Sequence, residues 1–581
     1  MPFLHQFDYI FALGVIFAFL DGWNIGANDV ANSFATSVSS RSLTMRQAMM
    51  IASVCEFGGA VLVGSRVAET IRSKVIAVNR FEEQPEVLML GMLCALVGSS
   101  TYLTLATRLG LPVSTTHCIV GGVIGVGIAT LGAGGVNWGW KGVSQIFAAW
   151  AVAPGIAGAL AAIIFLITKY GVMKRANPLR NGLIAIPFYF AITSGILTMM
   201  VVWKGAPALK VDRLSTGAVV GIILGVAFGV AAICIFFLLP YLYRRLQKED
   251  WTLHWYHVFL GPMLLFRGPV PERPSEYTHQ VVQDYYRGHM TKQQLAIAGI
   301  SNAEADNYEQ KQAVGGADLI EKPERQQGVT PNGPLEHDAD STHATAVTTT
   351  STPAMVGPWY KPANLWRKGT YYFFRGVNHD PASEQSTAKT NPYLTGNLKD
   401  MHARATHYDN KAEYLYSFLQ VMTAMTASFA HGSNDVSNAM GPLATIYLIW
   451  STATLSSTAP VPIWVLVFGG SAIVIGLWTY GYHIMRNLGN RLTLHSPSRG
   501  FSMELGAALT VVLATRLALP ISTTQCIVGA TVGVGLCTGD IKAINWRMVA
   551  WIYLGWFITL PCTALIAGCL MGIIINAPRW G

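Results

Sequence analysis

The sequence predicts an all-α polytopic membrane protein with about 12 transmembrane segments, arranged as two inverted-topology repeats that each contain a re-entrant helical hairpin. Three observations support this prediction. Of the 581 residues, 51% are hydrophobic and only 12% are charged, whereas soluble domains are about one quarter charged. Apolar runs of about 20 residues, the length that crosses a bilayer, recur along the chain. A polar motif inside these runs occurs twice.

The apolar segments form two groups on either side of a long polar region. The first group lies at 9–36, 47–64, 87–107, 113–132, 142–168, 183–203 and 215–243, and the second at 412–440, 461–483, 501–518, 521–538 and 547–576. The composition between the groups is typical of disorder. The predicted parts are therefore a first transmembrane repeat (1–168), connecting transmembrane helices (169–243), a cytosolic, largely disordered loop (244–411) and a second transmembrane repeat (412–581).

Basic residues gather in short loops between the apolar segments. The loops 37–46 and 169–182 carry lysine or arginine and no acidic residue, as is typical of cytosolic loops. Placing them in the cytosol puts both termini outside and the long middle loop inside. These loops also explain the net charge of +9, so we expect no nucleic-acid partner. The eight cysteines include no CxxC pair and predict neither a metal site nor disulfides.

The repeated motif places a carboxylate between carboxamides within an apolar run. Residues 26–33 read GANDVANS and residues 432–439 read GSNDVSNA. An unpaired charge at membrane depth costs several kcal/mol, so an acidic residue there indicates a functional site. Asp29 and Asp435 are therefore the centre of the predicted site.

A second motif follows each copy and separates two apolar runs with almost no polar loop. Residues 111–116 read LPVSTT and residues 519–524 read LPISTT. Proline suits the first turn of a helix, and the hydroxyls and free N–H groups after it can bind an anion. The alternative is a tight turn between two full spans, in which the hydroxyls cap the helix. The presence of two copies, each paired with an Asn-Asp motif, favours an anion site.

The two halves of the chain align closely around these motifs. Leu105–Gly127 matches Leu513–Gly535 without gaps, with 17 of 23 residues identical. A unit spanning 9–168 therefore recurs at 412–576. Because the charged loops start the first copy outside and the second inside, the repeat is predicted to be inverted, with binding at the midplane between the copies.

At these motifs the chain resembles the inorganic phosphate transporter (PiT) family, and its length and layout are most similar to the fungal members. The resemblance implies a homodimeric carrier in the plasma membrane that imports phosphate with sodium ions by alternating access. Sodium would be a co-transported substrate, and no cofactor is expected. We do not expect an enzyme, because the sequence has no Ser/His/Asp set, no His/Cys metal spacing and no phosphate-binding loop.

The residue types divide the two motifs between two ligands. Carboxylate and carboxamide oxygens suit Na⁺, and hydroxyls with helix N–H groups suit phosphate. The predicted sodium ligands are Asn28, Asp29, Asn434 and Asp435. The predicted phosphate ligands are Ser114, Thr115, Thr116, Ser522, Thr523 and Thr524, with Asn32 and Asn438. Helix–helix hydrogen bonding is the alternative role for the last two asparagines.

Four further residues are assigned to coupling or gating. Glu56 and Glu504 are acids within apolar segments, and the resemblance implies that both positions matter for function. They are not repeat equivalents, since Glu56 aligns with Val467 and Glu504 with Leu96. The alternative for each is a structural pair with an arginine or a backbone amide. Arg108 and Arg516 end the first arm of each hairpin, where they attract phosphate or cap helix carbonyls.

Other functions stay open on the sequence alone. His117 occupies the position of Gln525 in the second copy. A histidine there suggests proton coupling, although a hydrogen-bonded core histidine is the simpler explanation. Another oxyanion such as sulfate would meet the same chemistry. From a different class, the chain could be a phosphate-sensing membrane protein, which would need a structured middle region.

Overall fold

A computed structural model describes residues 4–65, 75–203, 211, 214–272, 281–297, 362–378, 394, 396–455, 461–485, 488–517 and 519–577. The chain divides into two compact units, 1–291 with 373–581, and 292–372. Within the described ranges the only β pairing is an isolated bridge between Ile76 and Val136. The protein is therefore all-α in the part that the structure describes, as the sequence predicts.

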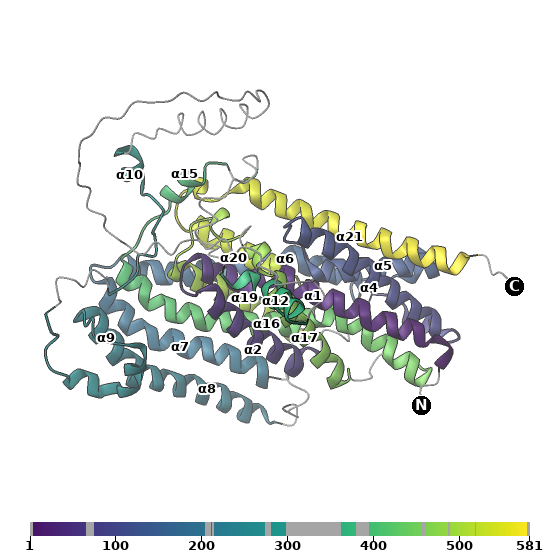
Figure 1. Cartoon of the computed structure of the whole chain (residues 1–581), viewed down its shortest axis with the longest axis horizontal. Helices are drawn as coiled ribbons and strands as arrows, with labels where there is room; N and C mark the ends of the chain where they lie inside the picture. Colours follow the sequence, from purple (N-terminus) through teal and green to yellow (C-terminus); the bar gives the residue numbers. More distant parts are fainter. Residues whose placement is uncertain are drawn as a thin grey trace. The chain divides into compact units, whose positions relative to one another are not determined.

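Each of the twelve predicted apolar segments coincides with a helix (Figure 1). The first repeat contains α1 (Asp8–Ser39), α2 (Met45–Val63), α4 (Pro85–Arg108), α5 (Thr115–Leu131) and α6 (Val143–Thr168). The second contains α16 (Asn410–Thr452), α17 (Ile463–Tyr480), α19 (Pro497–Arg516), α20 (Thr523–Leu536) and α21 (Trp546–Asn576). Between them lie α7 (Pro178–Val202) and α8 (Thr216–Ile233).

Shorter helical elements join these helices. They are η1 (His5–Phe7), η2 (Val78–Phe81), η3 (Ala133–Gly135), η4 (Lys169–Met173), η7 (Cys234–Leu238), α9 (Leu239–Gln247), η8 (Trp255–Phe266), α15 (Leu398–Ala403), η9 (Arg375–Asn378), α18 (Tyr482–Met485), η10 (Gly489–Arg491) and η11 (Ile541–Ala543). The described residues of the second unit include α10 (Lys292–Ile297) and most of α12 (Pro362–Phe373).

Helix length distinguishes the second arm of each hairpin, α5 or α20, from the full-length helices. Eight helices in the described ranges are long and apolar enough to cross a membrane. In contrast, α5 has 17 residues and α20 has 14, fewer than the roughly 20 that a span needs. Both follow the proline motifs. Their short length agrees with the predicted re-entrant hairpins, α4 with α5 and α19 with α20.

Helices of one repeat pack against helices of the other in exchanged pairs, meaning that each contact between two helices recurs with the repeats interchanged. Helix α1 packs on α17, and α16 packs on α2. Likewise α5 packs on α21, and α20 packs on α6. The motif helices α1 and α16 also contact each other, so each repeat completes the packing of the other.

Glycines allow the two motif helices to touch their partners backbone to backbone. A Cβ added at Gly26 would lie 1.9 Å from the Ile473 carbonyl oxygen, and one at Gly432 would lie 2.3 Å from that of Glu56. The two crossings therefore make Ile473 the counterpart of Glu56. The sequence alignment with Val467 was wrong by six positions, because it paired the Phe-Gly-Gly triplets rather than the glycines at the crossings.

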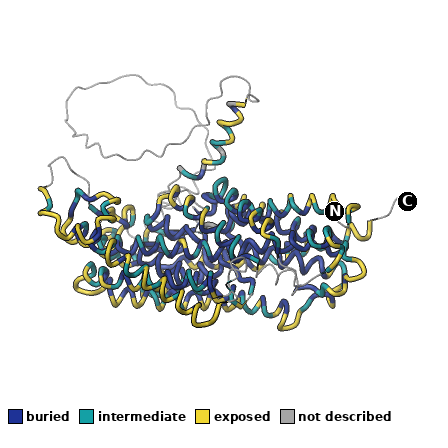
Figure 2. The backbone as a smooth tube through the Cα atoms, turned by 90° about the horizontal axis from the view of Figure 1, so that it is seen from below, coloured by how far each residue is buried: buried dark blue, intermediate teal, exposed yellow. Residues whose placement is uncertain are grey.

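Burial is concentrated around the motif helices. In Figure 2 the buried residues run through the interior of the bundle, and the exposed ones line its edges. Helix α8 is at the other extreme, since Val219 is its only buried residue. An almost wholly apolar helix with this exposure fits a lipid-facing position.

Parts of the predicted disordered loop are folded. Residues 244–272, 281–291 and 396–411 form short helices and turns with buried side chains, so the expectation of disorder does not extend to them. Tyr286, for example, donates a 2.7 Å hydrogen bond to Glu413 at the start of α16. Residues 298–361 and 379–393 lie outside the described residues. The average composition of residues 244–411 predicts disorder, and it does not reveal that the two ends of this region are folded.

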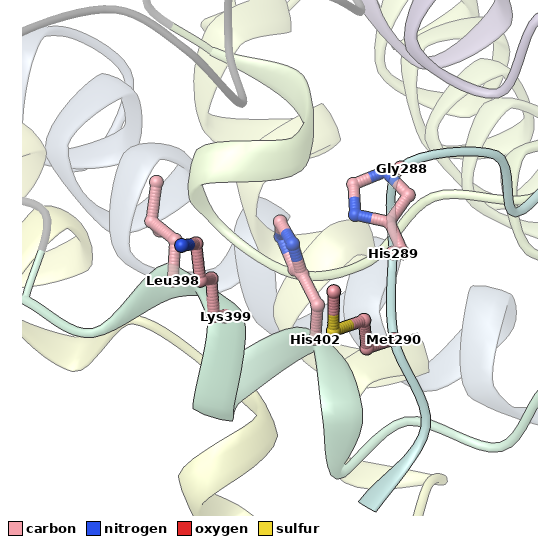
Figure 3. Close-up of a pocket in the computed structure, with 6 residues that line it drawn as sticks. All are labelled: Gly288, His289, Met290, Leu398, Lys399 and His402. Atoms are coloured by element: carbon pink, nitrogen blue, oxygen red, sulfur yellow. The ribbon is translucent and has the colours of Figure 1, made fainter. Parts of the chain in front are cut away.

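The folded ends of this loop enclose a cavity of about 70 Å³, lined by Gly288, His289, Met290, Leu398, Lys399 and His402 (Figure 3). The rings of His289 and His402 meet edge to face with their centroids 4.6 Å apart. A hydrogen bond to the second repeat holds the His402 ring, since its Nε2 lies 2.5 Å from the Asn490 carbonyl oxygen. The cavity thus joins the middle region to the second repeat.

Candidate functional site between the hairpin tips

The tips of the two hairpins meet between α1 and α16. The Thr116 hydroxyl donates to the Ile521 carbonyl at 3.2 Å, and the Thr524 hydroxyl donates to the Val113 carbonyl at 3.5 Å. Each tip therefore bonds to the backbone of the other. The sequence predicted a site between the copies, and these residues are brought together there.

Each motif carboxylate accepts a hydrogen bond from the hairpin of its own repeat. Thr115 donates to Asp29, and Thr523 donates to Asp435, both at 2.8 Å. Both aspartates are only 1% exposed. Equal distances at equivalent positions mean that the two repeats build the same half-site.

The carboxamides link the half-sites to each other. Asn32 donates to Thr524 at 2.8 Å, and Asn438 donates to Thr116 at 3.2 Å. The single Thr524 proton is shared between the Val113 carbonyl and Asp29, whose Oδ1 is the nearer acceptor at 3.1 Å. The hairpin of one repeat thus touches the motif helix of the other, so neither half-site is complete alone.

Asn28 and Asn434 fasten the hairpin tips to the motif helices. Asn28 donates to the Leu111 carbonyl at 3.0 Å and accepts from the Val113 N–H at 3.2 Å. Asn434 donates to the Ile521 carbonyl at 2.8 Å. These bonds place each proline motif beside an aspartate.

Three carboxamide oxygens at the site have no hydrogen-bond partner among the described residues. They belong to Asn32, Asn434 and Asn438, and all three are buried. A buried acceptor without a donor is unfavourable and calls for an explanation, such as an ion. Together with the two carboxylates, these oxygens form a donor set that suits a hard cation.

Ser114 and Ser522 act as helix caps. Each hydroxyl oxygen accepts the N–H of the residue three positions later, His117 or Gln525, at 3.3 Å. This is the capping role that the sequence left open. The hydroxyls of Thr115, Thr523 and Thr524, by contrast, donate to the carboxylates. The Thr116 hydroxyl donates to a backbone carbonyl.

A histidine that the sequence reasoning missed joins Glu56 to the site. His431 Nδ1 lies 2.6 Å from Glu56 Oε2, and its Nε2 lies 3.0 Å from Asp435 Oδ2. Nitrogen or oxygen atoms of Asp29, His431 and Asp435 all lie within 4.8 Å of one another. The signal was present, because a residue four positions before Asp435 shares its helix face.

Glu504 lies at a different level of the bundle. Its carboxylate accepts hydrogen bonds from side chains of α1 and α16: Thr36 at 2.5 Å, Ser37 at 2.6 Å, Gln420 at 3.1 Å and Thr423 at 2.6 Å. The expected alternative of an arginine or backbone partner is thus replaced by hydroxyls and an amide. This acid ties the two motif helices to α19.

The other predicted residues flank the hairpin tips. Arg108 is exposed at the end of α4, and the Arg516 guanidinium lies 4.6 Å from the centre of the Trp203 ring. His117 packs against Trp150, with ring centroids 3.7 Å apart. These contacts are those of helix ends and of a core histidine.

Comparison with known proteins decides the family. A model described as the phosphate transporter family matches residues 25–567. The chain belongs to the phosphate transporter family. Its membership places it among multi-pass membrane transporters rather than enzymes.

Named relatives agree with this assignment. The chain is 53% identical to the phosphate-repressible phosphate permease pho-4 of Neurospora crassa, over 100% of this chain and 99% of the relative. It is 30% identical to the sodium-dependent phosphate transporter 1 of Mus musculus, over 97% and 95%. A solved structure described as the sodium-dependent phosphate transporter shares the fold, with a TM-score of 0.59 at 24% identity, covering 98% of this chain and all of that one.

Proposed function

We propose that this member of the phosphate transporter family imports inorganic phosphate across the plasma membrane with sodium ions, by alternating access. The observation that carries the proposal is the pair of Asp–Thr contacts at the hairpin tips, together with three buried carboxamide oxygens that have no partner among the described residues. Such a site offers oxygen ligands to cations and hydroxyl donors to an anion within one enclosed space.

The two ligands have separate partners in this proposal. Asp29 and Asp435 hold sodium with the carboxamide oxygens of the motif helices. The hydroxyls of Thr115, Thr116, Thr523 and Thr524 turn to phosphate when sodium occupies the carboxylates. Ser114 and Ser522 contribute by holding the helix starts in place.

Charge explains why the ligands would travel together. Two bare carboxylates repel a phosphate that carries one or two negative charges, and bound sodium removes that repulsion. Each ligand then raises the affinity for the other by the same factor. In this proposal Glu56 influences the coupling between sodium and phosphate through His431. Glu504 influences it from the place where α1 and α16 meet α19.

The exchanged packing pairs support an inverted repeat. Helices α1 and α4 run parallel, because the hydrogen-bonded pairs progress along both from Asp21 with Ser99 to Asn28 with Thr107. In this proposal the first hairpin therefore enters from the side on which α1 begins. With the basic loops in the cytosol, that side is outside for the first repeat and inside for the second. This threading gives 12 segments, external termini and a cytosolic middle loop. The proposal includes a homodimer.

The test is uptake of radiolabelled phosphate by purified protein in liposomes. An inward sodium gradient should drive uptake, and potassium should not replace sodium. Asp29→Asn and Asp435→Asn serve as inactive controls of equal volume. Equal uptake under a pH gradient without sodium would instead support the proton-coupled alternative and overturn the proposed coupling.

A further inference from the structure

A second buried acid lies on α1, away from the hairpin tips. Asp21 is 0% exposed, and its Oδ1 accepts a 2.8 Å hydrogen bond from Ser99 of α4. Its Oδ2 is buried and has no hydrogen-bond partner in the described part of the chain. A neutral carboxylic acid would need an acceptor for its proton, and an ionised one needs a cation.

The neighbouring carboxamide presents a second open oxygen. Asn24 is also 0% exposed. Its amide nitrogen donates to the carbonyls of Leu20 and Ser100 and to the hydroxyl of Thr104, between 2.9 and 3.3 Å. Its Oδ1, like Asp21 Oδ2, lacks a partner among the described residues. Positions 21 and 24 are one turn apart, so both side chains lie on one helix face.

We propose that Asp21 and Asn24, with the Ser99 hydroxyl, form an additional sodium-binding site between α1 and α4. The carboxylate supplies the charge, and the carboxamide and hydroxyl oxygens complete an all-oxygen donor set, as a hard cation requires. The site deepens the proposed sodium coupling and rests on it.

The position of this site is suitable for a sodium ion that moves along α1 toward the hairpin tips. Buried polar residues continue from it along α1 at a spacing of three or four, namely Asn24, Asn28, Asn32 and Thr36. Asp21 is eight residues from Asp29, roughly 12 Å along the helix. Thr104, which accepts a hydrogen bond from Asn24, is exposed on α4. Under the proposed threading the site is on the outer side.

The second repeat has no equivalent of this site. The counterparts of Asp21 and Asn24 are Ala427 and Ala430, and those of Ser99 and Ser100 are Ala507 and Ala508. General structural needs of the repeat therefore do not require these polar groups. Their presence in one copy alone favours a role in binding from one side.

The test combines sodium binding with uptake. Purified protein is titrated with ²²Na⁺ without phosphate, and liposomes are assayed for phosphate uptake at varied external sodium. Asp21→Asn should remove one bound sodium per protein and raise the sodium concentration for half-maximal uptake at least ten-fold, while the KM for phosphate at saturating sodium changes less than two-fold.

Two adjacent serines provide a milder variant and its control. Ser99→Ala should raise the half-maximal sodium concentration about three-fold, which corresponds to about 0.65 kcal/mol, because a neutral hydroxyl contributes less than the charged carboxylate. Ser100→Ala should leave it unchanged, because its hydroxyl bonds only the Val97 carbonyl in the described contacts. Normal sodium binding in both Asp21→Asn and Ser99→Ala would overturn the site. Sodium-independent uptake by the unaltered protein would refute the proposed coupling instead, and the ²²Na⁺ count would still decide the site.

Discussion

The two half-sites share their centre and differ in their surroundings. At the centre, Asp29 with Thr115 repeats as Asp435 with Thr523 at the same 2.8 Å. Around the second aspartate, His431 and Glu56 form a chain of buried polar contacts. The first half-site has apolar side chains at both corresponding places, Ile25 and Ile473.

A second difference runs the other way. The first repeat carries the buried polar pair of Asp21 and Asn24, where the second has Ala427 and Ala430. The comparison teaches that two-fold symmetry applies to the contacts between the aspartates and the hairpin threonines. The groups that differ lie beside these contacts and give the two half-sites different surroundings.

The largest expected effect comes from the helix crossings that both repeats share. Gly26→Ala or Gly432→Ala should prevent accumulation of folded protein, because the new Cβ meets a backbone oxygen at 1.9 or 2.3 Å and the helices must separate at a cost above about 3 kcal/mol. Gly225→Ala on α8 is the matched control, since nothing lies within 4 Å of its added Cβ. Size-exclusion profiles in detergent would measure the outcome. A monodisperse Gly26→Ala protein of normal thermal stability would refute the close crossing.

The next effect tests the symmetry of the centre. Asp29→Asn and Asp435→Asn should each lower sodium-driven phosphate uptake more than 100-fold, which corresponds to about 2.7 kcal/mol, because in the proposed mechanism each carboxylate balances a sodium charge. Uptake by reconstituted protein at matched insertion is the measurement. If one variant transports normally, the half-sites are unequal at their centre.

The contacts of Glu56 and His431, which only the second half-site has, should matter less for transport than the two aspartates. Replacing both Glu56 and His431 with isoleucine copies the apolar surroundings of the first half-site. We expect uptake about ten-fold lower, since Asp435 loses one contact of about 1.4 kcal/mol. His431→Ile alone should lower thermal stability more than the double change, because it leaves Glu56 buried without its partner. A double variant that is less stable than the single variant would speak against this pairing.

The smallest effect concerns the histidine-lined cavity at the folded ends of the middle region. Burial lowers the pKa of His402 to about 4. Burial, together with repulsion of a protonated ring by the neighbouring histidines and Arg41, lowers the pKa of His289 to about 3. Both are neutral in the folded state, while an unfolded histidine titrates near 6.5. Stability is therefore full above pH 6.5 and falls as pH drops toward 4, by about 1.4 kcal/mol per pKa unit.

Hydrogen exchange at residues 281–291 and 396–405 would measure this change. Exchange there should accelerate between pH 7.5 and 5 after correction for the intrinsic rate, while the amides of α17 stay protected. His402→Gln should reduce the acceleration. Equal protection of 281–291 at both pH values would contradict the neutral, buried state of these rings.

The sequence predicted the helices and the centre better than the surroundings. Periodic apolar runs and a gap-free repeat suffice to place α1, α16 and both hairpins, and residue chemistry suffices to pair Asp29 with the threonine motif. His431 escaped notice because its importance depends on Glu56, which lies on another helix. The role of Ser114 as a cap, and the counterpart of Glu56, likewise depend on geometry that sequence spacing does not contain.

The most direct test of the account is a pair of binding titrations on purified protein, phosphate with and without sodium, and sodium with and without phosphate. The account predicts that sodium lowers the Kd for phosphate at least ten-fold, and that phosphate lowers the Kd for sodium by the same factor. In Asp29→Asn both factors should shrink toward one. A phosphate Kd that is independent of sodium in the unaltered protein would contradict joint binding between the hairpin tips.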